Sequence, residues 1–242
     1  ILTLNLTGKV SLVTGSSRGL GLSIARQLAQ SGSNIVMCGR SEESLLKAKE
    51  ELTTMYPSVR IESLQTDVSL ESDVIRLFDF IDKTWSRLDI CVNNAAMLKL
   101  SDFVDYDLAL WNAMVAANLT SAFLCSHAAF KLMSRDSVSK KSIVNIGSLS
   151  GIRGVEKFAG MSAYIACKHA LVGLTESLAV EGKPNGIHVN CVAPGSIKTD
   201  MFQRNFPDFE PGSTPEDIAK NVLLFCDVNN TALTSGSIFE IF

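Results

Sequence analysis

The sequence predicts an α/β fold, a doubly wound parallel sheet of seven strands with helices on both faces. Two observations predict it. Short β-branched runs alternate with longer segments of helical period along the whole chain, which is the pattern of successive βαβ units. No linker, internal repeat or low-complexity tract interrupts the 242 residues, so a single domain with one large core is expected over 1–242.

Each element follows from its own stretch of sequence. The strands are expected at the β-branched runs 9–15, 34–40, 60–68, 88–94, 142–148, 186–195 and 236–241. The helices are expected at the segments of helical period 20–32, 41–56, 70–86, 105–133, 162–182 and 215–227. Pro215 suits a first helical turn, and the acids Glu216 and Asp217 suit the helix dipole. The irregular stretch 195–214 fits either a substrate lid or a plain surface loop.

The composition favours a small-molecule partner. Apolar residues make up 46% of the chain, charged residues 19%, and the net charge is only −3, which argues against nucleic acid or an anionic membrane as the main partner. The chain has no run of 18 apolar residues and no basic segment followed by an apolar one. Neither a membrane span nor a secretory signal is therefore predicted.

Cysteine and histidine usage indicates a cytoplasmic protein without a metal site. Each of the six cysteines stands alone in an apolar run, with no CxxC pair, so buried free thiols in a reducing compartment are expected. His127, His169 and His188 are isolated and lack the paired spacing of metal ligands.

The segment TGSSRGLG, residues 14–21, has the pattern of a phosphate-binding turn. It follows the first predicted strand and opens the first predicted helix, so its glycines fall where backbone must turn tightly beside a helix N-terminus. This placement favours dinucleotide binding over an ordinary strand-to-helix turn. The residues expected to contact the dinucleotide are Gly15, Ser17, Arg18, Gly19, Leu20 and Gly21.

The end of the second strand favours NADP(H) over NAD(H). A carboxylate there would bind the ribose 2′-hydroxyl and repel a 2′-phosphate, but the chain has Arg40 and Ser41. Arg18 could reach the same phosphate from the glycine segment. Either arginine alone would be interpreted as a solvated surface charge, whereas both together, with no acid at the strand end, indicate the 2′-phosphate.

More polar residues fall at the carboxyl ends of the third and fourth strands, the edge at which open α/β sheets bind ligands. Asp67 and Val68 close the third strand, and Asn93, Asn94 and Ala95 close the fourth. Asp67 could hydrogen-bond an adenine, and the asparagine turn could line the path of the cofactor. Capping of the following helices explains the same residues equally well.

Tyr164 and Lys168 stand four residues apart in a predicted helix, so both side chains can address one ligand. A phenol with a pKa near 10 is a poor acid at neutrality. We expect Lys168 and a positive nicotinamide ring to bring that pKa to about 7, where general acid catalysis works best. Ser148, at the end of the fifth strand, could polarise a substrate carbonyl.

These motifs together resemble the short-chain dehydrogenase/reductase family, over about residues 6–241. The glycine segment, the NNAA turn at 93–96, the Ser148, Tyr164 and Lys168 set, and PGSIKT at 194–199 occur in the order of that family. The resemblance implies a Rossmann fold.

The same resemblance implies roles for individual residues. Tyr164 would give a proton to the carbonyl oxygen, Lys168 would bind the nicotinamide ribose, and Ser148 would orient the substrate. Asn118 would hold a water of the proton relay to Lys168. The nicotinamide would be flanked by Pro194, Gly195, Ile197 and Thr199.

Two further features concern assembly and substrate. The resemblance implies a homotetramer or homodimer in which the helices 105–133 and 162–182 pack against copies of themselves. The chain departs from the family pattern between Ser148 and Tyr164, where fifteen residues form a longer loop than is usual. That loop could shape the substrate pocket.

The predicted function is NADPH-dependent reduction of a ketone or aldehyde, such as a 3-oxoacyl thioester or another apolar carbonyl compound. The side chains expected around the substrate are Met97, Leu98, Phe158, Met161, Met201, Phe202 and Phe206. The alternatives are an NAD-dependent alcohol dehydrogenase of the same family, an epimerase or lyase that uses hydride transiently, and a catalytically silent dinucleotide-binding scaffold. The scaffold would have a broken catalytic set, which the sequence does not show.

Overall fold

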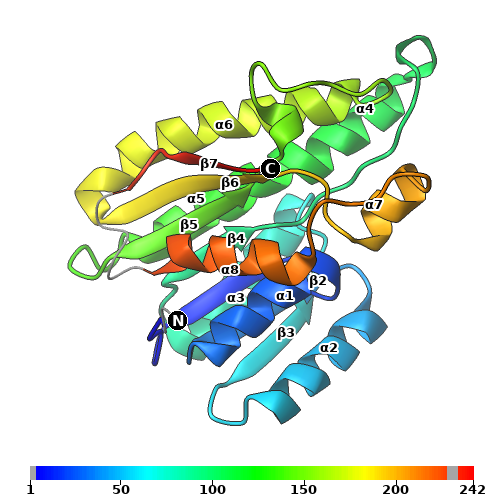
Figure 1. Ribbon diagram of the computed structural model, residues 1–242. Coiled ribbons are helices and arrows are strands. Elements are labelled where there is room, and N and C mark those ends of the chain that lie inside the picture. The colour runs from blue at the N-terminus through cyan, green and yellow to red at the C-terminus, as the bar shows by residue number, and fades with distance from the viewer. Residues whose placement is uncertain (1–3, 228–233) are drawn as a thin grey trace.

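The computed structural model describes residues 4–227 and 234–242, and these residues contain one sheet of seven parallel strands (Figure 1). The sheet order is β3-β2-β1-β4-β5-β6-β7, so the chain winds from β1 to one edge and then from β4 to the other. This confirms the predicted fold class. The strands are β1 (Val10–Thr14), β2 (Asn34–Gly39), β3 (Ile61–Gln65), β4 (Ile90–Asn93), β5 (Lys141–Ile146), β6 (Ile187–Pro194) and β7 (Ile238–Ile241).

Helices cover both faces of the sheet (Figure 1). They are α1 (Gly19–Gln30), α2 (Glu42–Met55), α3 (Glu71–Trp85), α4 (Leu108–Val115), α5 (Ser121–Met133), α6 (Ser162–Gly182), α7 (Asp200–Asn205) and α8 (Pro215–Cys226). The apolar sides of α1, α2 and α8 form one core with the sheet, and those of α3, α5 and α6 form a second core on its other face. Neighbouring residues of β1 pack into different cores, because successive side chains of a strand point to opposite faces of the sheet. Val13 belongs to the first core and Leu12 to the second.

The segment predicted as a single helix over 105–133 is more complex. Residues Phe103–Asp105 form a short 3-10 turn, and α4 begins only after its N-cap Asp107, whose carboxylate accepts from the Leu110 amide at 2.6 Å. A π-helical turn at Ala116–Thr120 then joins α4 to α5. The helix therefore continues to Met133 as expected, but with an altered turn in its middle.

Three other expectations about boundaries are wrong, each near the carboxyl edge. β3 ends at Gln65, so Asp67 and Val68 lie in the loop beyond it, and β5 ends two residues before Ser148. The Ser148 side chain instead accepts from the Ser150 amide at 3.1 Å and caps a 3-10 turn. The stretch 195–214 is not wholly irregular, because it contains α7.

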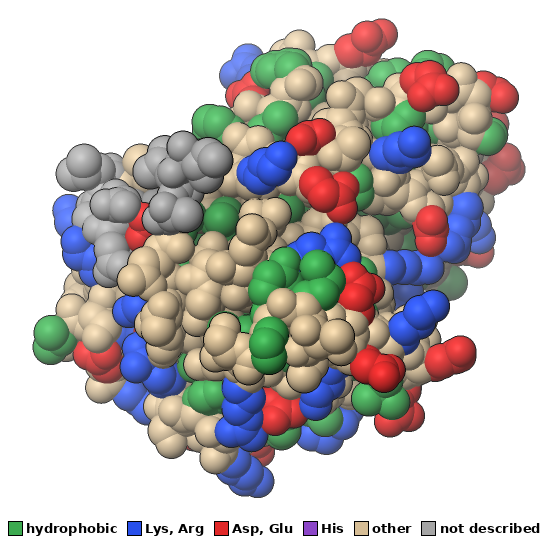
Figure 2. All heavy atoms as spheres, turned by 60° about the horizontal axis from the view of Figure 1, so that its bottom comes forward, with side chains coloured by type: hydrophobic (Ala, Val, Ile, Leu, Met, Phe, Trp, Pro, Cys, Tyr) green, Lys and Arg blue, Asp and Glu red, His purple; other side chains and the backbone are tan. Residues whose placement is uncertain are grey.

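Among the described residues, one helical segment, Leu108–Met133, has the length and composition that could cross a membrane, with a mean hydropathy of 1.5 and 28% of its most apolar window buried. A core helix can have the same composition, and the inner side of this one packs into the second core through Cys125, Ala129 and Met133. On the face of the molecule shown in Figure 2, Lys and Arg side chains are interspersed with Asp and Glu side chains.

Candidate active site

The turn between β1 and α1 leaves backbone room for a ligand. Gly15 and Gly19 have φ values of +64° and +56°, which glycine adopts without strain. A Cβ on Gly21 would lie 2.2 Å from the Gly15 carbonyl oxygen and 2.5 Å from Asn94 Nδ2. The N-cap Arg18 makes no side-chain hydrogen bond to the helix, and no acid lies in the first turn of α1. The start of α1 therefore has the geometry and charge that suit a phosphate.

Two side chains brace this turn from neighbouring strands. Thr14 Oγ1 accepts from the backbone amides of Asn94 and Ala95, both at 3.0 Å. Asn94 Nδ2 donates to the carbonyl oxygens of Thr14 at 2.9 Å and Gly15 at 3.2 Å. This role of Thr14 was not predicted from the sequence. Its position as the last residue of the first strand, at the edge where the ligand is expected, could have indicated it.

The asparagines of the NNAA turn have different environments. Asn94 and Ala95 line the large cavity described below, whereas Asn93 is buried away from it. Asn93 Nδ2 donates to Ser126 Oγ at 2.9 Å and to Asn145 Oδ1 at 2.8 Å. The expectation that Asn93 lines the cofactor path is therefore wrong, because its side chain points to the other face of the sheet, where it joins β4 to β5 and α5.

A hydroxyl-rich corner follows β2. Gln65 Nε2 donates to the Arg40 carbonyl oxygen at 2.9 Å, which ties the turn after β2 to the end of β3. Ser41 Oγ accepts from the Ser44 amide at 3.3 Å and lies 3.0 Å from Ser44 Oγ, to which it donates. Ser44 lines the cavity beside Arg40 and Ser41 and was not predicted. The sequence feature that could have indicated Ser44 is its position three residues after Ser41, the N-cap of α2.

Arg18 and Asp67 have partners inside the protein. Arg18 Nη1 lies 3.7 Å from Asp200 Oδ2 at the start of α7, with both side chains largely exposed. Asp67 Oδ1 accepts from the Ser69 amide at 3.0 Å and from Ser69 Oγ at 2.6 Å, so it stabilises the turn before α3. Contacts of either residue with a nucleotide stay predictions.

Ser148, Tyr164 and Lys168 meet at the carboxyl end of β5. The side chains of Tyr164 and Lys168 come from the first two turns of α6, and Lys168 Nζ donates to the Ile146 carbonyl oxygen at 2.7 Å. The same Nζ lies 5.5 Å from the centroid of the Tyr164 ring. Ser148 is close enough to the Tyr164 hydroxyl to lower its pKa. The three side chains line one wall of the cavity.

The expected electrostatic effect of Lys168 on Tyr164 is not found. Burial raises the pKa of Tyr164 to about 12, and Ser148 offsets only part of that rise. Burial also lowers the pKa of Lys168 to about 8. Desolvation disfavours the charged form of each group, and the ammonium is directed to the Ile146 carbonyl and the ring face rather than to the hydroxyl. The protein alone therefore keeps the phenol protonated.

Asn118 lies in the π-helical turn and is buried. Its Oδ1 accepts from the Met97 amide at 3.1 Å, and its Nδ2 donates to the carbonyl oxygens of Met97 at 2.9 Å and Met114 at 2.8 Å. Both amide hydrogens are thus engaged, and the side chain fixes the segment after β4 against α4. Asn118 does not line the cavity, and its part in a proton relay stays a prediction.

One cavity of about 900 Å³ connects these parts. Apart from Asn93, its lining includes the residues predicted to bind the cofactor: Gly15, Ser17, Arg18, Gly19, Leu20, Gly21, Arg40, Ser41, Asp67, Val68, Asn94, Ala95, Pro194, Gly195, Ile197 and Thr199. At the far end, beyond Tyr164, it is lined by Met97, Leu98, Met201 and Phe202. Of the apolar residues expected there, Phe158, Met161 and Phe206 are not part of the lining.

The shape of the site suits a dinucleotide. Within residues 4–227 and 234–242, no group of three or more His, Cys, Asp and Glu side chains is placed to hold a metal ion. The glycine turn and the start of α1 fit a pyrophosphate, because Gly15 and Gly19 adopt positive φ values there and the helix N-terminus attracts an anion.

The fold and this cavity define a dinucleotide-binding α/β protein of the Rossmann type. The family model for short chain dehydrogenases matches residues 9–209. The chain belongs to the short-chain dehydrogenase/reductase family, and it is an oxidoreductase of the kind that uses NAD(P) and acts on small molecules.

Characterised relatives and solved structures cover nearly the whole chain. A 3-oxoacyl-[acyl-carrier-protein] reductase, FabG, from Aquifex aeolicus is 35% identical over 92% of this chain and 92% of its own length. A 3beta-hydroxysteroid dehydrogenase from Mediterraneibacter gnavus is 33% identical over 89% of this chain and 79% of its own. A short chain dehydrogenase from Burkholderia cenocepacia, solved in complex with NADP, has a TM-score of 0.87 and 30% identity over 98% of this chain and 97% of its own.

Proposed function

We propose that this protein is an NADPH-dependent carbonyl reductase that converts a ketone or aldehyde to an alcohol, with Tyr164 as proton donor. The observation that carries the proposal is that one cavity is lined both by Ser148, Tyr164 and Lys168 and by the glycine turn and Arg40. The substrate class includes 3-oxoacyl thioesters and other apolar carbonyl compounds.

Bound NADPH supplies the hydride in this reaction. Tyr164 starts in the form that a proton donor needs, because its pKa of about 12 keeps it protonated. Ser148, which lines the cavity together with Tyr164, places the carbonyl oxygen within reach of the phenol. Lys168 holds the ribose and adds positive charge as the oxygen gains negative charge.

The preference for NADP(H) is supported by the corner after β2. Arg40, Ser41 and Ser44 line the cavity there, and no carboxylate occupies the strand end that would repel a 2′-phosphate. The structural relative solved with NADP agrees with this preference. We expect NADPH to bind at least tenfold more tightly than NADH, which corresponds to about 1.4 kcal/mol.

The test is a panel of carbonyl compounds assayed by loss of NADPH absorbance, with wild type and Tyr164→Phe compared. This substitution keeps the ring and removes only the hydroxyl, so kcat should fall by roughly 10² to 10⁴. NADPH affinity, measured by fluorescence titration, should stay unchanged. Turnover that survives the substitution would contradict the role of Tyr164.

Other results of the same assay would favour the alternatives. A preference for NADH together with faster alcohol oxidation would indicate an NAD-dependent dehydrogenase. Tight NADPH binding without turnover on any carbonyl compound would indicate a silent scaffold.

We also propose a cytoplasmic homotetramer or homodimer. All six cysteines are buried and unpaired, as in proteins of reducing compartments. The exposed side of the α4 to α5 segment is apolar, with Phe123 49% exposed, and α6 carries Val180 at 75%. Such faces are typical of interfaces between subunits.

A further inference from the structure

Four phenylalanines form a cluster at the substrate end of the cavity, and we call them the aromatic clasp. Phe206 is at its centre, with ring centroids 5.2 Å from Phe202, 6.2 Å from Phe158 and 6.2 Å from Phe209. Phe158 belongs to the long loop before α6, and the other three belong to α7 and the residues after it. The clasp therefore joins the loop before α6 to the segment of α7.

Only one ring of the aromatic clasp faces the substrate. Phe202 lines the cavity, whereas Phe158 and Phe206 lie behind it. Phe158 is half exposed and partly buries one side of Phe206. The position of Phe202 thus depends on a ring, Phe206, that does not itself touch the cavity.

Hydrogen bonds connect the two segments of the aromatic clasp to the residues that follow β4, and we call the three connected segments the collar. Asn205 Nδ2 donates to the Leu98 carbonyl oxygen at 3.3 Å and to that of Met201 at 2.8 Å. The Ser101 amide donates to the Gly160 carbonyl oxygen at 3.1 Å. The segment after β4, the loop before α6 and the helix α7 are therefore connected pairwise around the mouth of the cavity.

The walls inside the collar are apolar near the place of the reacting carbonyl. Met97, Leu98, Met201 and Phe202 contribute them, and small side chains at Ala113 and Ala117 leave width on the facing wall. A substrate whose body extends from Tyr164 toward Phe202 would bury its methylene groups against these side chains. Each buried methylene raises affinity by roughly a factor of four.

We propose that Phe206, supported by Phe158, is a positioning residue that holds Phe202 against the substrate. In this way the aromatic clasp makes the enzyme select carbonyl compounds with an extended apolar body over short ones. The inference rests on the proposed carbonyl reductase function and narrows its substrate class. Phe206 acts through Phe202 and makes no contact with the reacting atoms.

The experiment measures kcat and KM with NADPH for a series of straight-chain methyl ketones from butanone to decanone. In the wild type, kcat/KM should rise by up to roughly fourfold for each added methylene. Phe206→Ala should flatten this rise through KM, and leave kcat/KM for butanone within about twofold of the wild type. Phe158→Ala should act in the same direction, and Phe206→Tyr, which keeps the ring, should restore the rise.

Phe239→Ala is the matched control. Phe239 is also a partly exposed ring in an aromatic pair, 5.4 Å from Phe225, but it lies on β7 outside the cavity lining. Its substitution should leave the dependence on chain length unchanged.

Four results would overturn the proposal. A loss in Phe206→Ala that is equal for all ketones would show only structural damage, and an unchanged rise would show that the aromatic clasp does not set substrate length. A flat series in the wild type itself would contradict the selection for apolar length. If the wild type reduces no carbonyl compound while it binds NADPH, the proposed function fails together with this inference.

Discussion

At the scale of single residues, burial decides the chemistry of the site more than the neighbouring charge does. Tyr164 and Lys168 are one helical turn apart, yet burial raises the pKa of the phenol to about 12 and lowers that of the ammonium to about 8. Both shifts favour the neutral form. The phenol is then protonated at neutrality and is a weaker acid than free tyrosine. Lys168, with a pKa of about 8, titrates close to physiological pH.

The pKa of Lys168 predicts how nucleotide binding depends on pH. Because the pKa is lowered from 10.5 to about 8, the side chain is charged below about pH 8 and neutral above it. The Kd for NADPH, measured by fluorescence titration, should be constant below pH 8 and increase above it.

Two substitutions test the origin of that increase. Lys168→Arg keeps the charge through this range and should give a constant Kd, while Lys168→Met should give a weaker and constant one. An increase that persists in Lys168→Met would assign the titration to another group.

At the scale of elements, the glycine turn and the π-helical turn show two different origins of local structure. The glycine turn can be predicted from the sequence, because the positive φ values at Gly15 and Gly19 favour glycine. The π-helical turn at Ala116–Thr120 is not, because Asn118 stabilises it through bonds to Met97, which is 21 residues away.

Gly21→Ala should weaken nucleotide binding and destabilise the turn. The added methyl group would lie 2.2 Å from the Gly15 carbonyl oxygen, so the turn or Asn94 has to move. We expect the Kd for NADPH to rise at least tenfold and the thermal midpoint to fall.

Gly173→Ala is the control on the helix α6. A Cβ there meets nothing within 4 Å, and alanine in a helix interior is more favourable than glycine by roughly 0.5 to 1 kcal/mol. The thermal midpoint should therefore rise slightly with NADPH affinity unchanged. If Gly21→Ala and Gly173→Ala changed NADPH affinity and the thermal midpoint equally, the close approach of Gly21 to the Gly15 carbonyl oxygen would be contradicted.

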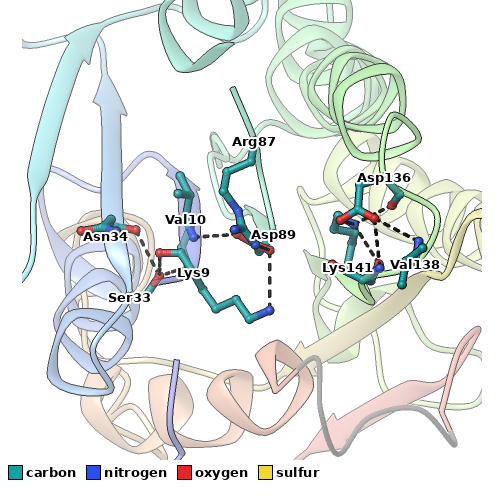
Figure 3. A network of polar contacts seen from close by, with 11 residues as sticks. Lys9, Val10, Ser33, Asn34, Arg87, Asp89, Asp136, Val138 and Lys141 are labelled. Atoms are coloured by element: carbon teal, nitrogen blue, oxygen red, sulfur yellow. Dashed lines mark hydrogen bonds and ion pairs between the residues drawn. The ribbon is translucent and has the colours of Figure 1, made fainter. Parts of the chain in front are cut away.

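At the scale of the whole molecule, stability and chemistry are placed at opposite ends of the sheet. Asp89, just before β4, is fully buried and is the centre of the network in Figure 3. Its carboxylate accepts from the Val10 amide at 2.9 Å and from Arg87 Nε and Nη2 at 2.9 and 2.6 Å. Lys9 Nζ lies 3.8 Å away. This network joins the starts of β1 and β4, whereas the cavity lies at their carboxyl ends.

Asp89→Asn should therefore destabilise the fold and leave the folded site active. The Arg87 side chain is 45% exposed, so the loss is that of hydrogen bonds to a buried carboxylate, each contributing about 1.5 to 3 kcal/mol. This loss should lower the urea midpoint clearly, while kcat per folded molecule stays the same. Asp82→Asn is the control, because Asp82 pairs with Arg135 at the surface and such pairs contribute about 0 to 1 kcal/mol. A large loss of kcat in the folded Asp89→Asn protein would contradict this separation.

The proposed assembly gives a further prediction at this scale. Phe123→Glu places a charge on the exposed apolar side of α5, where Phe123 stacks on His127 at 5.8 Å. If that side forms the subunit interface, sedimentation should show a smaller particle at equal concentration. An unchanged mass would place the interface elsewhere or indicate a monomer.

Much of the fold follows from local pattern. All seven strands occur near their predicted positions, and so do the helices from α1 to α8 apart from the short α7. The start of α8 at Pro215 agrees with the first-turn signals, and Thr214 caps it by accepting from the Asp217 amide at 3.2 Å. α7 was missed because its six residues are too few for a helical period to show.

The candidate site was only partly predictable for a related reason. Glycines after a strand and a Tyr and Lys one turn apart have a meaning that depends on nearby residues alone. The placement of Asn93 on the far face and the partners of Arg18 depend on which strands and loops become neighbours. The spacing of residues in a single sequence does not show which distant strands and loops become neighbours.

The sequence by itself determined the order of strands and helices, the glycine turn and the family of the protein, because each of these depends on short-range pattern and on residue types at fixed spacing. The tertiary structure alone decided that Tyr164 is a weaker acid than free tyrosine, that Asn118 supports a π-helical turn, and that Phe206 lies behind Phe202. Burial and contacts between distant segments produce these features, and both exist only once the chain has folded.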